Sequence, residues 1–365
     1  MRYTIEVKLI AGSETKFLYI YRGGKYEKIF QHRVDNFNYD RPVRYAGKFR
    51  FHVVFQKTIL AINGKRGWSM KGKVVIISGA ASGIGAETAL LLAKNGASLV
   101  IADINEQALA ERVKELRTIH DYVVAGPLDV RKRESWESIL KTGTTAFGTA
   151  DVLINCAGVA DPEPLHIIPE ELMRNQVDVN LTGAMLGTQV MLKYFLKRQK
   201  GHIIHIASLA ALAPLPDQAA YTASKFGLRG FCLALDLELR KSPVNISIIC
   251  PDAVNTPMLV HEAMNGVSSL VFSGSLLHPD RVAMAVLKTI QKPKREVLVP
   301  RYRGWLSKLA CAAPWVLSFM FPVMDRIGKR NLNEYVKECG MREVATLQSN
   351  FVRKQQGERE YHELK

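Results

Sequence analysis

The sequence predicts an α/β fold, a doubly wound, seven-stranded parallel sheet with helices on both faces. Seven short runs rich in Val, Ile and Leu alternate with helical stretches, and such continuous apolar runs are typical of parallel strands that are buried on both faces. A glycine-rich segment follows the first run, where folds of this class turn from the first strand into the first helix. The predicted strands are residues 74–77, 98–102, 122–124, 152–154, 203–207, 244–250 and 296–299.

Length and composition divide the 365 residues into three segments. Residues 70–300 carry the alternating pattern and are long enough for one large domain. Residues 1–69 form a basic N-terminal extension, and residues 301–365 form an apolar, helical C-terminal tail. The five cysteines lack Cys-x-x-Cys spacing, which favours free thiols in a reducing, cytoplasmic setting over disulfides or metal ligands. We therefore predict no metal site.

The N-terminal extension carries no motif with a clear chemical role. Of the net charge of +16, +9 lies in residues 1–69. Residues 5–9 alternate apolar and polar side chains, and residues 23–24 and 63–64 are turn signals, so short β-hairpins are one option. Basic charge with interleaved aromatic residues would suit RNA, but no aromatic RNA-binding motif is present, so we expect no nucleic-acid partner. The alternative is a dispensable extension, with the working protein starting at Met70.

The glycine-rich segment 78–85 is the first candidate binding element. It lies between the predicted strand 74–77 and an amphipathic helix that we expect from Ala86 to Asn95. Glycines let the backbone approach a pyrophosphate closely, and the helix N-terminus supplies unpaired N–H groups and the positive end of its dipole. This context predicts a dinucleotide site. The candidate residues are Ser78, Gly79, Ser82, Gly83, Ile84 and Gly85.

Asp103 is the candidate that selects the cofactor. It ends the second predicted strand, 18 residues after Gly85, where a dinucleotide-binding fold places the acid that hydrogen-bonds to the adenosine ribose. Its carboxylate would repel a 2′-phosphate, and no nearby base offsets that charge, so NAD is favoured over NADP. The alternative is a surface residue that caps the helix beginning at Asn105.

Further cofactor candidates follow the third and fourth predicted strands. Asp129 is placed to meet an adenine edge, although it could equally cap a helix that starts near Arg131. The small residues of segment 155–158 follow the carboxyl end of the fourth strand and suit a wall against the cofactor. The candidates in these two places are Asp129, Val130, Asn155, Ala157 and Gly158.

Two other segments are harder to interpret. A helix that opens at Pro169 and runs through Gly183 contains Asn180, whose amide is costly among apolar neighbours unless it has hydrogen-bond partners. Residues 258–278 are rich in Met, Leu, Val and Phe. They predict either a mobile substrate lid or apolar core beneath a loop.

Tyr221 and Lys225 are the central candidates for catalysis. They lie four residues apart in a helix predicted over 218–239, so they share one face. An ammonium beside a phenol favours phenolate and lowers the tyrosine pKa, which would let it exchange a proton with an alcohol or carbonyl near neutral pH. Ser208 follows the fifth strand, and its hydroxyl could hold the same substrate oxygen. A bare Tyr-x-x-x-Lys pair would more often be a solvated helix face.

Taken in order, these segments resemble the motifs of the short-chain dehydrogenase/reductase family over about residues 71–300. Residues 78–85 are similar to its Thr-Gly-x-x-x-Gly-x-Gly turn, with Ser78 in place of Thr, and residues 155–158 are similar to its Asn-Asn-Ala-Gly segment. Residues 251–256 resemble its Pro-Gly-x-x-x-Thr segment, with Asp252 in place of Gly. The residues that match its catalytic tetrad are Asn180, Ser208, Tyr221 and Lys225.

The resemblance implies a Rossmann-fold, NAD(P)-dependent oxidoreductase and assigns roles to the tetrad. Tyr221 would be the general acid/base, and Lys225 would lower its pKa and bind the nicotinamide ribose. Ser208 would position the substrate oxygen, and Asn180 would hold a water in the proton relay. With all four residues present, the resemblance implies an active enzyme.

The resemblance also bears on cofactor and substrate. It implies that Val254 and Thr256 hold the nicotinamide carboxamide. The family spans sterols, retinoids, sugars, keto-acyl chains and aromatic diols, so it names no substrate. Residues 221–230 are similar to members that act on long-chain lipid ketones, such as 3-ketosphinganine reductases. We expect a lipophilic secondary alcohol or ketone. Those reductases mostly use NADPH, against which Asp103 argues.

The tail after residue 300 departs from the family pattern. Residues 305–324 contain two tryptophans and two phenylalanines between basic flanks, which suits a segment lying in the membrane interface. The longest uncharged run, 309–324, is too short and too interrupted by proline to predict a membrane span. The alternative is a helix packed on the sheet or on a second subunit. We expect a homo-oligomer in the cytoplasm, with peripheral membrane contact as an option. The rival function is a non-catalytic nucleotide sensor that docks on membranes.

Overall fold

The computed structural model describes residues 7–11, 15–22, 25–33 and 68–338, and the chain forms two compact units, Met1–Gly67 and Trp68–Lys365. In the first unit, three antiparallel strands follow one another: β1 (Val7–Ala11), β2 (Thr15–Arg22) and β3 (Lys25–Arg33). Strand β2 ends at Arg22 and β3 begins at Lys25, so the pair of glycines that we expected in a turn separates two hydrogen-bonded strands. The turn expected at residues 63–64 lies outside the described residues.

The second unit contains the predicted seven-stranded parallel sheet. Its strand order is β10-β9-β8-β7-β4-β5-β6, and every neighbouring pair is parallel. The chain therefore builds outward from β4 in one direction and then, from β7, in the other. This reversal opens a crevice at the carboxyl ends of β4 and β7, where doubly wound folds bind their ligands. The strands are β4 (Val74–Ser78), β5 (Ser98–Asp103), β6 (Val123–Pro127), β7 (Val152–Asn155), β8 (Gly201–Ile206), β9 (Val244–Pro251) and β10 (Glu296–Val299).

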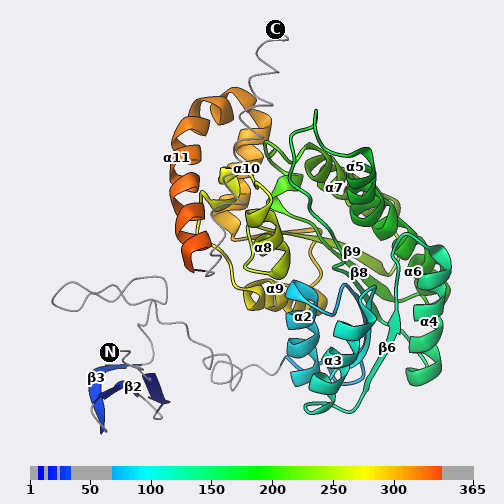
Figure 1. The fold of residues 1–365 in the computed structure, drawn as a ribbon. Coiled ribbons are helices and arrows are strands. Elements are labelled where there is room, and N and C mark those ends of the chain that lie inside the picture. The colour runs from blue at the N-terminus through cyan, green and yellow to red at the C-terminus, as the bar shows by residue number, and fades with distance from the viewer. Residues whose placement is uncertain (1–6, 12–14, 23–24, 34–67, 339–365) are drawn as a thin grey trace. The chain divides into compact units, whose positions relative to one another are not determined.

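Helices cover both faces of this sheet (Figure 1). Val75 and Ile77 of β4 belong to the apolar core beneath one group of helices, and Val74 and Ile76 belong to the core beneath the other. This alternation follows the period of two along a strand, and it explains why β4 is apolar at every position. The first group is α2 (Gly83–Lys94), α3 (Glu106–Arg117) and α9 (Pro279–Gln291), and the second is α4 (Arg133–Phe147), α6 (Ala184–Arg198) and α7 (Ala219–Glu238).

The helix that we predicted through Gly183 continues beyond it. It begins as α5 (Glu170–Val177), passes through a π-helical turn, η2 (Asp178–Gly183), and continues as α6. Gly183 packs against Val130 inside the protein and does not end the helix. A Cβ on Gly183 would lie 2.8 Å from Cγ2 of Val130. The π turn contains Asn180, and such turns are frequent at functional sites.

The apolar segment 258–278 is both core and cavity wall. It forms α8 (Pro257–Met264) and the short 3₁₀ helix η4 (Ser269–Phe272). Leu259 and Phe272 are buried and join Tyr335 of the C-terminal helix in a small separate apolar cluster. The Tyr335 hydroxyl also donates a hydrogen bond to Oδ1 of Asn255, at 3.0 Å. The segment is thus held in place from the C-terminal side.

The C-terminal tail packs on the fold as two helices, α10 (Arg301–Ala312) and α11 (Pro314–Glu338). Gly304 lets α10 lie against β10, since a Cβ there would come within 2.5 Å of Cβ of Leu298. Gly328 lets α11 lie against η4, since a Cβ there would come within 1.9 Å of the Ser269 carbonyl oxygen. Within the described ranges, helices of the length and apolarity that a membrane span requires are absent.

Candidate active site

The glycine-rich turn packs against the loop that follows β7. Gly79 has a φ of +65°, and a Cβ on it would lie 2.7 Å from the backbone nitrogen of Ala157. A Cβ on Gly85 would lie 2.0 Å from the Gly79 carbonyl oxygen. The Ser78 hydroxyl accepts hydrogen bonds from the Cys156 and Ala157 N–H groups, at 3.1 and 3.4 Å. Ser78 is thus a buried link between the two loops, and the glycines leave the turn without side chains where the crevice opens.

Asp103 lies against the same turn. Its Oδ2 accepts a hydrogen bond from the Ala81 N–H group and its Oδ1 accepts one from Asn105, both at 3.0 Å. The helix cap is Asn105, whose side chain accepts from Ala108, so Asp103 is not the cap that we considered as its alternative role. Each carboxylate oxygen has a second acceptor position, which leaves Asp103 able to receive ribose hydroxyls. The remaining turn residues lie beside it: Ser82 is exposed at the N-cap of α2, and Ile84 lines the cavity described below.

Asp129 and Val130 hold the loop after β6. Oδ1 of Asp129 accepts from the backbone and the side chain of Arg131, and these contacts hold the pKa of its carboxyl below the usual range. Val130 is buried, and its carbonyl oxygen accepts from Nε1 of Trp136. The helix begins two residues after Arg131, with Lys132 at its N-cap position, so Asp129 shapes the loop and does not occupy the cap.

The loop after β7 approaches two of the candidate catalytic residues, Asn180 and Lys225. A Cβ on Gly158 would lie 3.1 Å from Oδ1 of Asn180 and 3.5 Å from Nζ of Lys225. Asn155 is buried beneath this loop, and its Nδ2 lies 3.2 Å from Nδ1 of His205. Among the candidates of this loop, Gly158 therefore lies beside the catalytic group, while the side chain of Asn155 is turned into the protein.

Val254 and Thr256 close the crevice from the other side. A Cβ on Gly83 would lie 3.3 Å from Cγ2 of Thr256, so this segment lies beside the glycine-rich turn. Val254 forms an isolated β-bridge with Leu277 and lines the same cavity as Thr256. Oγ1 of Thr256 also accepts from the Leu259 N–H group and caps α8.

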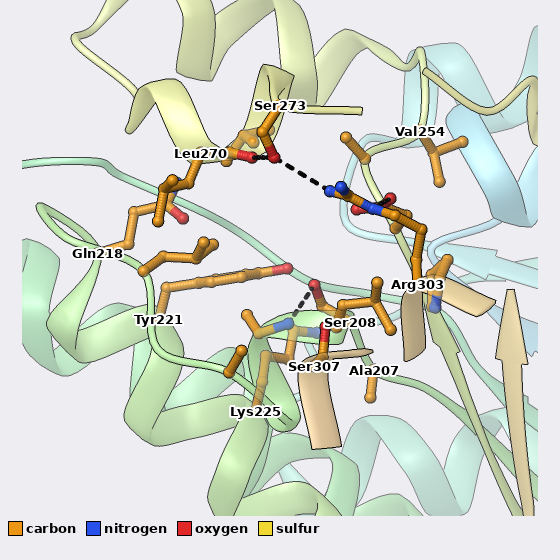
Figure 2. Close-up of a pocket in the computed structure, with 18 of the residues that line it drawn as sticks. Ala207, Ser208, Gln218, Tyr221, Lys225, Val254, Leu270, Ser273, Arg303 and Ser307 are labelled. Atoms are coloured by element: carbon orange, nitrogen blue, oxygen red, sulfur yellow. Dashed lines mark hydrogen bonds and ion pairs between the residues drawn. The ribbon is translucent and has the colours of Figure 1, made fainter. Parts of the chain in front are cut away.

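Tyr221, Ser208 and Lys225 line a cavity of about 420 Å³ above this crevice. Figure 2 shows the Tyr221 side chain directed toward Ser208, to which its hydroxyl is hydrogen-bonded. Oγ of Ser208 is fixed in turn by the Ala210 N–H group, at 3.1 Å. Nζ of Lys225 lies 5.5 Å from the centre of the Tyr221 ring and 3.5 Å from the Ile206 carbonyl oxygen. The structure brings together the three residues that the sequence placed in one site.

The expected lowering of the Tyr221 pKa is wrong for the protein without its cofactor. Burial is the largest effect and raises the pKa of Tyr221, and the carboxylate of Glu262 raises it further. The hydrogen bond with Ser208 opposes both. Burial likewise lowers the pKa of Lys225 to about 8, so its ammonium is itself poorly stabilised. At this depth the loss of solvation has the largest effect on both pKa values.

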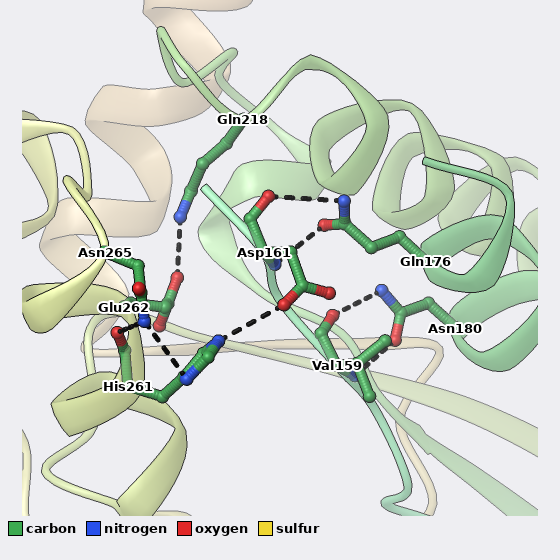
Figure 3. Close-up of polar contacts among 8 residues, drawn as sticks. All are labelled: Val159, Asp161, Gln176, Asn180, Gln218, His261, Glu262 and Asn265. Carbon is green, nitrogen blue, oxygen red and sulfur yellow. Dashed lines mark hydrogen bonds and ion pairs between the residues drawn. The ribbon is translucent and has the colours of Figure 1, made fainter. Parts of the chain in front are cut away.

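Asn180 is buried and uses its amide to hold the loop after β7. Its Oδ1 accepts from the Val159 N–H group at 2.8 Å, and its Nδ2 donates to the Val159 carbonyl oxygen at 2.9 Å (Figure 3). Nδ2 also donates to Oγ of Ser224, one position before Lys225, at 3.1 Å. These hydrogen bonds offset the cost of burying an amide in an apolar helix. They also place Asn180 between the loop after β7 and helix α7.

Several polar residues of the cavity were not predicted as site residues. Glu262 of α8 and Gln218, at the start of α7, are buried in its wall, and Arg303 reaches it from α10. Arg303 donates to Oδ2 of Asp252 at 2.7 Å and to Oγ of Ser273 at 3.2 Å. The replacement of the family's glycine by Asp252 was the one available signal, since an acid there needs a partner. Nothing local in the sequence indicated that α10 supplies it.

A doubly wound parallel sheet, a glycine-rich turn at its switch point and a Tyr-Lys-Ser group in the adjoining cavity define a nicotinamide-dependent oxidoreductase. A family profile described as short chain dehydrogenase matches residues 73–265. The chain belongs to this family, and it is an NAD(P)-dependent dehydrogenase or reductase. The fold and the enzyme class that the sequence predicted are thereby confirmed.

Individual relatives agree with this assignment. An uncharacterised oxidoreductase of Listeria monocytogenes is 32% identical over 232 residues, which is 62% of this chain and 93% of the relative. A 3-oxoacyl-[acyl-carrier-protein] reductase of Thermotoga maritima is 32% identical over 221 residues, 60% of this chain and 90% of the relative. A crystal structure of a Burkholderia phymatum short chain dehydrogenase/reductase in complex with NAD matches with a TM-score of 0.59 and 28% identity, over 63% of this chain and 89% of that one.

Proposed function

We propose that the protein transfers a hydride between NAD and a lipophilic secondary alcohol or the matching ketone. The observation that carries this proposal is the cavity itself, in which Tyr221 and Ser208 are set into a wall that is otherwise largely apolar. Apolar side chains from four separate elements contribute to it, so a ligand there exchanges water for hydrocarbon contacts. Examples are Leu215, Leu259, Leu270, Leu306, Met320 and Met324.

The residues divide the chemistry between them. The nicotinamide, when bound, supplies or receives the hydride. Tyr221 gives its proton to the developing alkoxide in reduction and takes it back in oxidation, while Ser208 holds the same oxygen. Lys225 contributes a positive charge beside the Tyr221 ring. Asn180 positions the catalytic helix through Ser224 and fixes the facing loop.

NAD suits the cofactor crevice better than NADP. The carboxylate of Asp103 lies within hydrogen-bond distance of the Ala81 N–H group in the turn, where the adenosine ribose binds in this fold. A 2′-phosphate would meet that negative charge at close range. The Burkholderia relative was crystallised with NAD, which agrees with the proposal.

The combination of substrate and cofactor has two candidates. The Thermotoga relative is named a 3-oxoacyl-[acyl-carrier-protein] reductase, which favours reduction of a ketone on an acyl-like chain. A reductase of the 3-ketosphinganine type, dependent on NADPH, remains the alternative, and it would need Asp103 to tolerate the 2′-phosphate. Turnover of lipophilic alcohols and ketones with both cofactors separates these possibilities.

Replacing Tyr221 with Phe tests the catalytic assignment. The variant lacks the proton-exchanging hydroxyl but keeps the ring, so turnover should fall by roughly 10²–10⁴-fold. NAD binding, measured by titration calorimetry, should remain within about threefold of wild type, because the hydroxyl lies in the substrate cavity. Wild-type turnover by the variant would refute the assignment.

We also propose that the two C-terminal helices contact an anionic membrane surface. Trp315, Phe319, Val323 and Ile327 follow one another at intervals of four on α11, and their exposed fractions are 74%, 84%, 64% and 47%. Such a row of large apolar side chains on one helix face is costly in water. Exposed Arg301 and Arg326 on the same two helices suit anionic lipid.

Vesicle flotation tests this contact. Wild-type protein should float with vesicles that contain phosphatidylserine, and Phe319→Glu should remain at the bottom of the gradient. Leu237→Glu, which changes a similarly exposed apolar residue on α7, is the matched control and should float. If Phe319→Glu instead dissociates a dimer by light scattering and wild type does not float, the face binds a second copy and the membrane proposal is wrong.

A further inference from the structure

The substrate cavity contains a second polar pair besides Tyr221 and Ser208. Glu262 and Gln218 both line it, and their exposed fractions are only 8% and 2%. Nε2 of Gln218 donates a hydrogen bond to Oε1 of Glu262, at 2.6 Å (Figure 3). The neighbouring wall residues Leu215, Leu259 and Leu270 are apolar. A buried carboxyl and amide in such a wall lower stability unless their polar atoms are paired.

One polar group of this pair has no partner. Oε1 of Gln218 is buried, and none of the described residues hydrogen-bonds to it. Turning the amide around would let a protonated Glu262 donate to Oε1, but Nε2 would then lack a partner instead. In either arrangement the pair leaves one hydrogen-bonding group of Gln218 unpaired. An unpaired buried group lowers stability, and a ligand atom that pairs with it would remove that cost.

The charges around Glu262 indicate what kind of ligand atom fits. Lys225 and Tyr221 face it from α7, and Asp161 faces it from the loop after β7. Burial raises the pKa of Glu262 to about 7, against the hydrogen bond from Gln218 and the charge of Lys225. Near neutral pH the pair therefore offers acceptors and, when protonated, a donor. A hydroxyl group can satisfy both states, because it donates and accepts.

Charged ligand groups fit less well. Lys225 also lines the cavity, and its positive charge disfavours an ammonium group. The carboxyl of Glu262 disfavours an anion at the same place. A neutral hydroxyl is the group that neither repels.

We propose that Glu262 and Gln218 form a subsite for a second hydroxyl of the substrate, so that the favoured substrates are apolar diols and hydroxyketones. The inference rests on the proposed function, in which Tyr221 and Ser208 hold the reacting oxygen. Gln218 lies three residues before Tyr221, and Figure 2 draws both on the wall of one cavity. The second hydroxyl is therefore on a different carbon of the molecule that Tyr221 and Ser208 hold.

A matched substrate series tests the subsite. Each 2-alkanol is paired with the diol that adds a hydroxyl at the other end of the chain, and the ratio of the two kcat/KM values is measured for each length. Wild type should prefer the diol at one or two lengths. Glu262→Leu and Gln218→Leu should each reduce that preference by about tenfold, the value of one hydrogen bond, through KM.

Two controls separate binding from structural damage. Glu262→Gln keeps an oxygen to accept from Gln218 while removing the acid, and it should retain part of the preference. Glu137→Gln makes the same change at an exposed position on α4 and should leave the preference unchanged. Thermal melting with NAD present identifies any variant that fails to fold. A preference that stays the same in folded Leu variants would overturn the inference.

A binding measurement distinguishes failure of the subsite from failure of the proposed reaction. Calorimetric titration of the NAD-loaded protein with the diol and the mono-alcohol reports the subsite without turnover. Tighter diol binding that is lost in Gln218→Leu, together with no turnover of any alcohol or ketone, would refute the reaction and keep the subsite. Turnover with equal affinity for both ligands would refute the subsite alone.

Discussion

At the residue scale, Asp103 connects the glycine-rich turn to cofactor choice. Its two carboxylate oxygens accept backbone N–H groups on either side, so the charge is held in one place and not on a flexible side chain. A fixed carboxylate can hydrogen-bond to ribose hydroxyls and repel a 2′-phosphate in the same geometry. In the proposed function, this one side chain would therefore both bind NAD and exclude NADP.

Asp103→Ala should remove this discrimination. NAD affinity should fall by roughly 10–100-fold, the effect of losing hydrogen bonds to a charged group, while NADP affinity should stay the same or rise. The measurement is the ratio of the two dissociation constants by calorimetry. If both constants change by the same factor, the carboxylate supports the loop and does not select the cofactor.

Glu262 is the second residue with a consequence for the whole protein. Its pKa rises from 4.5 to about 7 on folding, chiefly through burial, so the folded protein holds this proton more tightly than the unfolded chain. Its contribution to stability is therefore fully present below about pH 4.5 and is lost as the pH rises through about 7.

Glu262→Gln should remove that pH dependence. We consider the free energy of unfolding of the variant minus that of wild type. This difference should be larger near pH 8 than near pH 5, by at most roughly 3 kcal/mol. Urea unfolding of both proteins at each pH measures the difference. Burial lowers the pKa of His202 to about 4 and of His205 to about 3, and their opposite pH effect cancels in this comparison. An equal difference at both pH values would contradict the buried ionisation of Glu262.

At the element scale, the turn from β4 into α2 depends on the absence of side chains. Gly79 combines a positive φ of +65° with a backbone neighbour 2.7 Å from where a Cβ would lie. Backbone atoms cannot rotate away as a side chain would, so the turn or the loop after β7 must move. Ser78 ties that loop to the turn, and both border the cofactor crevice.

Gly79→Ala should therefore impair NAD binding more than folding. We expect the NAD affinity to fall by at least tenfold. The free energy of unfolding should fall by about 1–2 kcal/mol, because alanine is disfavoured at a left-handed backbone position. Gly230→Ala is the control, because Gly230 lies inside α7 with nothing within 4 Å of the added Cβ. It should leave NAD binding unchanged and raise stability by up to about 1 kcal/mol. Equal NAD affinity in Gly79→Ala would show that the turn tolerates the shift.

At the scale of the whole molecule, the C-terminal helices form part of the wall of the candidate active site. Arg303 of α10 reaches back to Asp252, which lies just after β9, in the segment that leads to Val254 and Thr256. Only 19% and 11% of the two side chains are exposed, so the pair is partly shielded from solvent. Leu306 and Met324 from the same helices line the cavity. This ion pair, together with the Tyr335–Asn255 hydrogen bond, links the packing of the tail to the wall of the cavity.

Arg303→Met should loosen this link. The lost pair leaves the carboxylate of Asp252 unpartnered, so the KM for a lipophilic substrate should rise by roughly tenfold or more while NAD still binds. Asp252→Asn should raise this KM by a similar factor. In a double-mutant cycle, the KM of the double variant should be no higher than that of either single variant. The control is Arg330→Met, which breaks an exposed ion pair with Glu334. It should lower the free energy of unfolding by at most about 0.5 kcal/mol. Additive effects in the cycle would show that the pair does not act as a unit.

The sequence by itself determined the sheet, the glycine-rich turn and the order of Ser208, Tyr221 and Lys225. These features are local: a run of apolar residues, a glycine spacing and a helical repeat each predict their own structure. Strand ends differed from prediction by a few residues, and nothing local in the sequence indicated that Gly183 packs against a distant residue, Val130.

Only the tertiary structure decided which polar groups line the cavity. Glu262, Gln218 and Arg303 come from α8, the start of α7 and α10, and meet in one cavity although up to 85 positions separate them. The direction of the Tyr221 pKa shift was decided in the same way, since burial depends on everything packed around the phenol. Local patterns follow from backbone periodicity, whereas burial and charge at a site are sums over the whole fold.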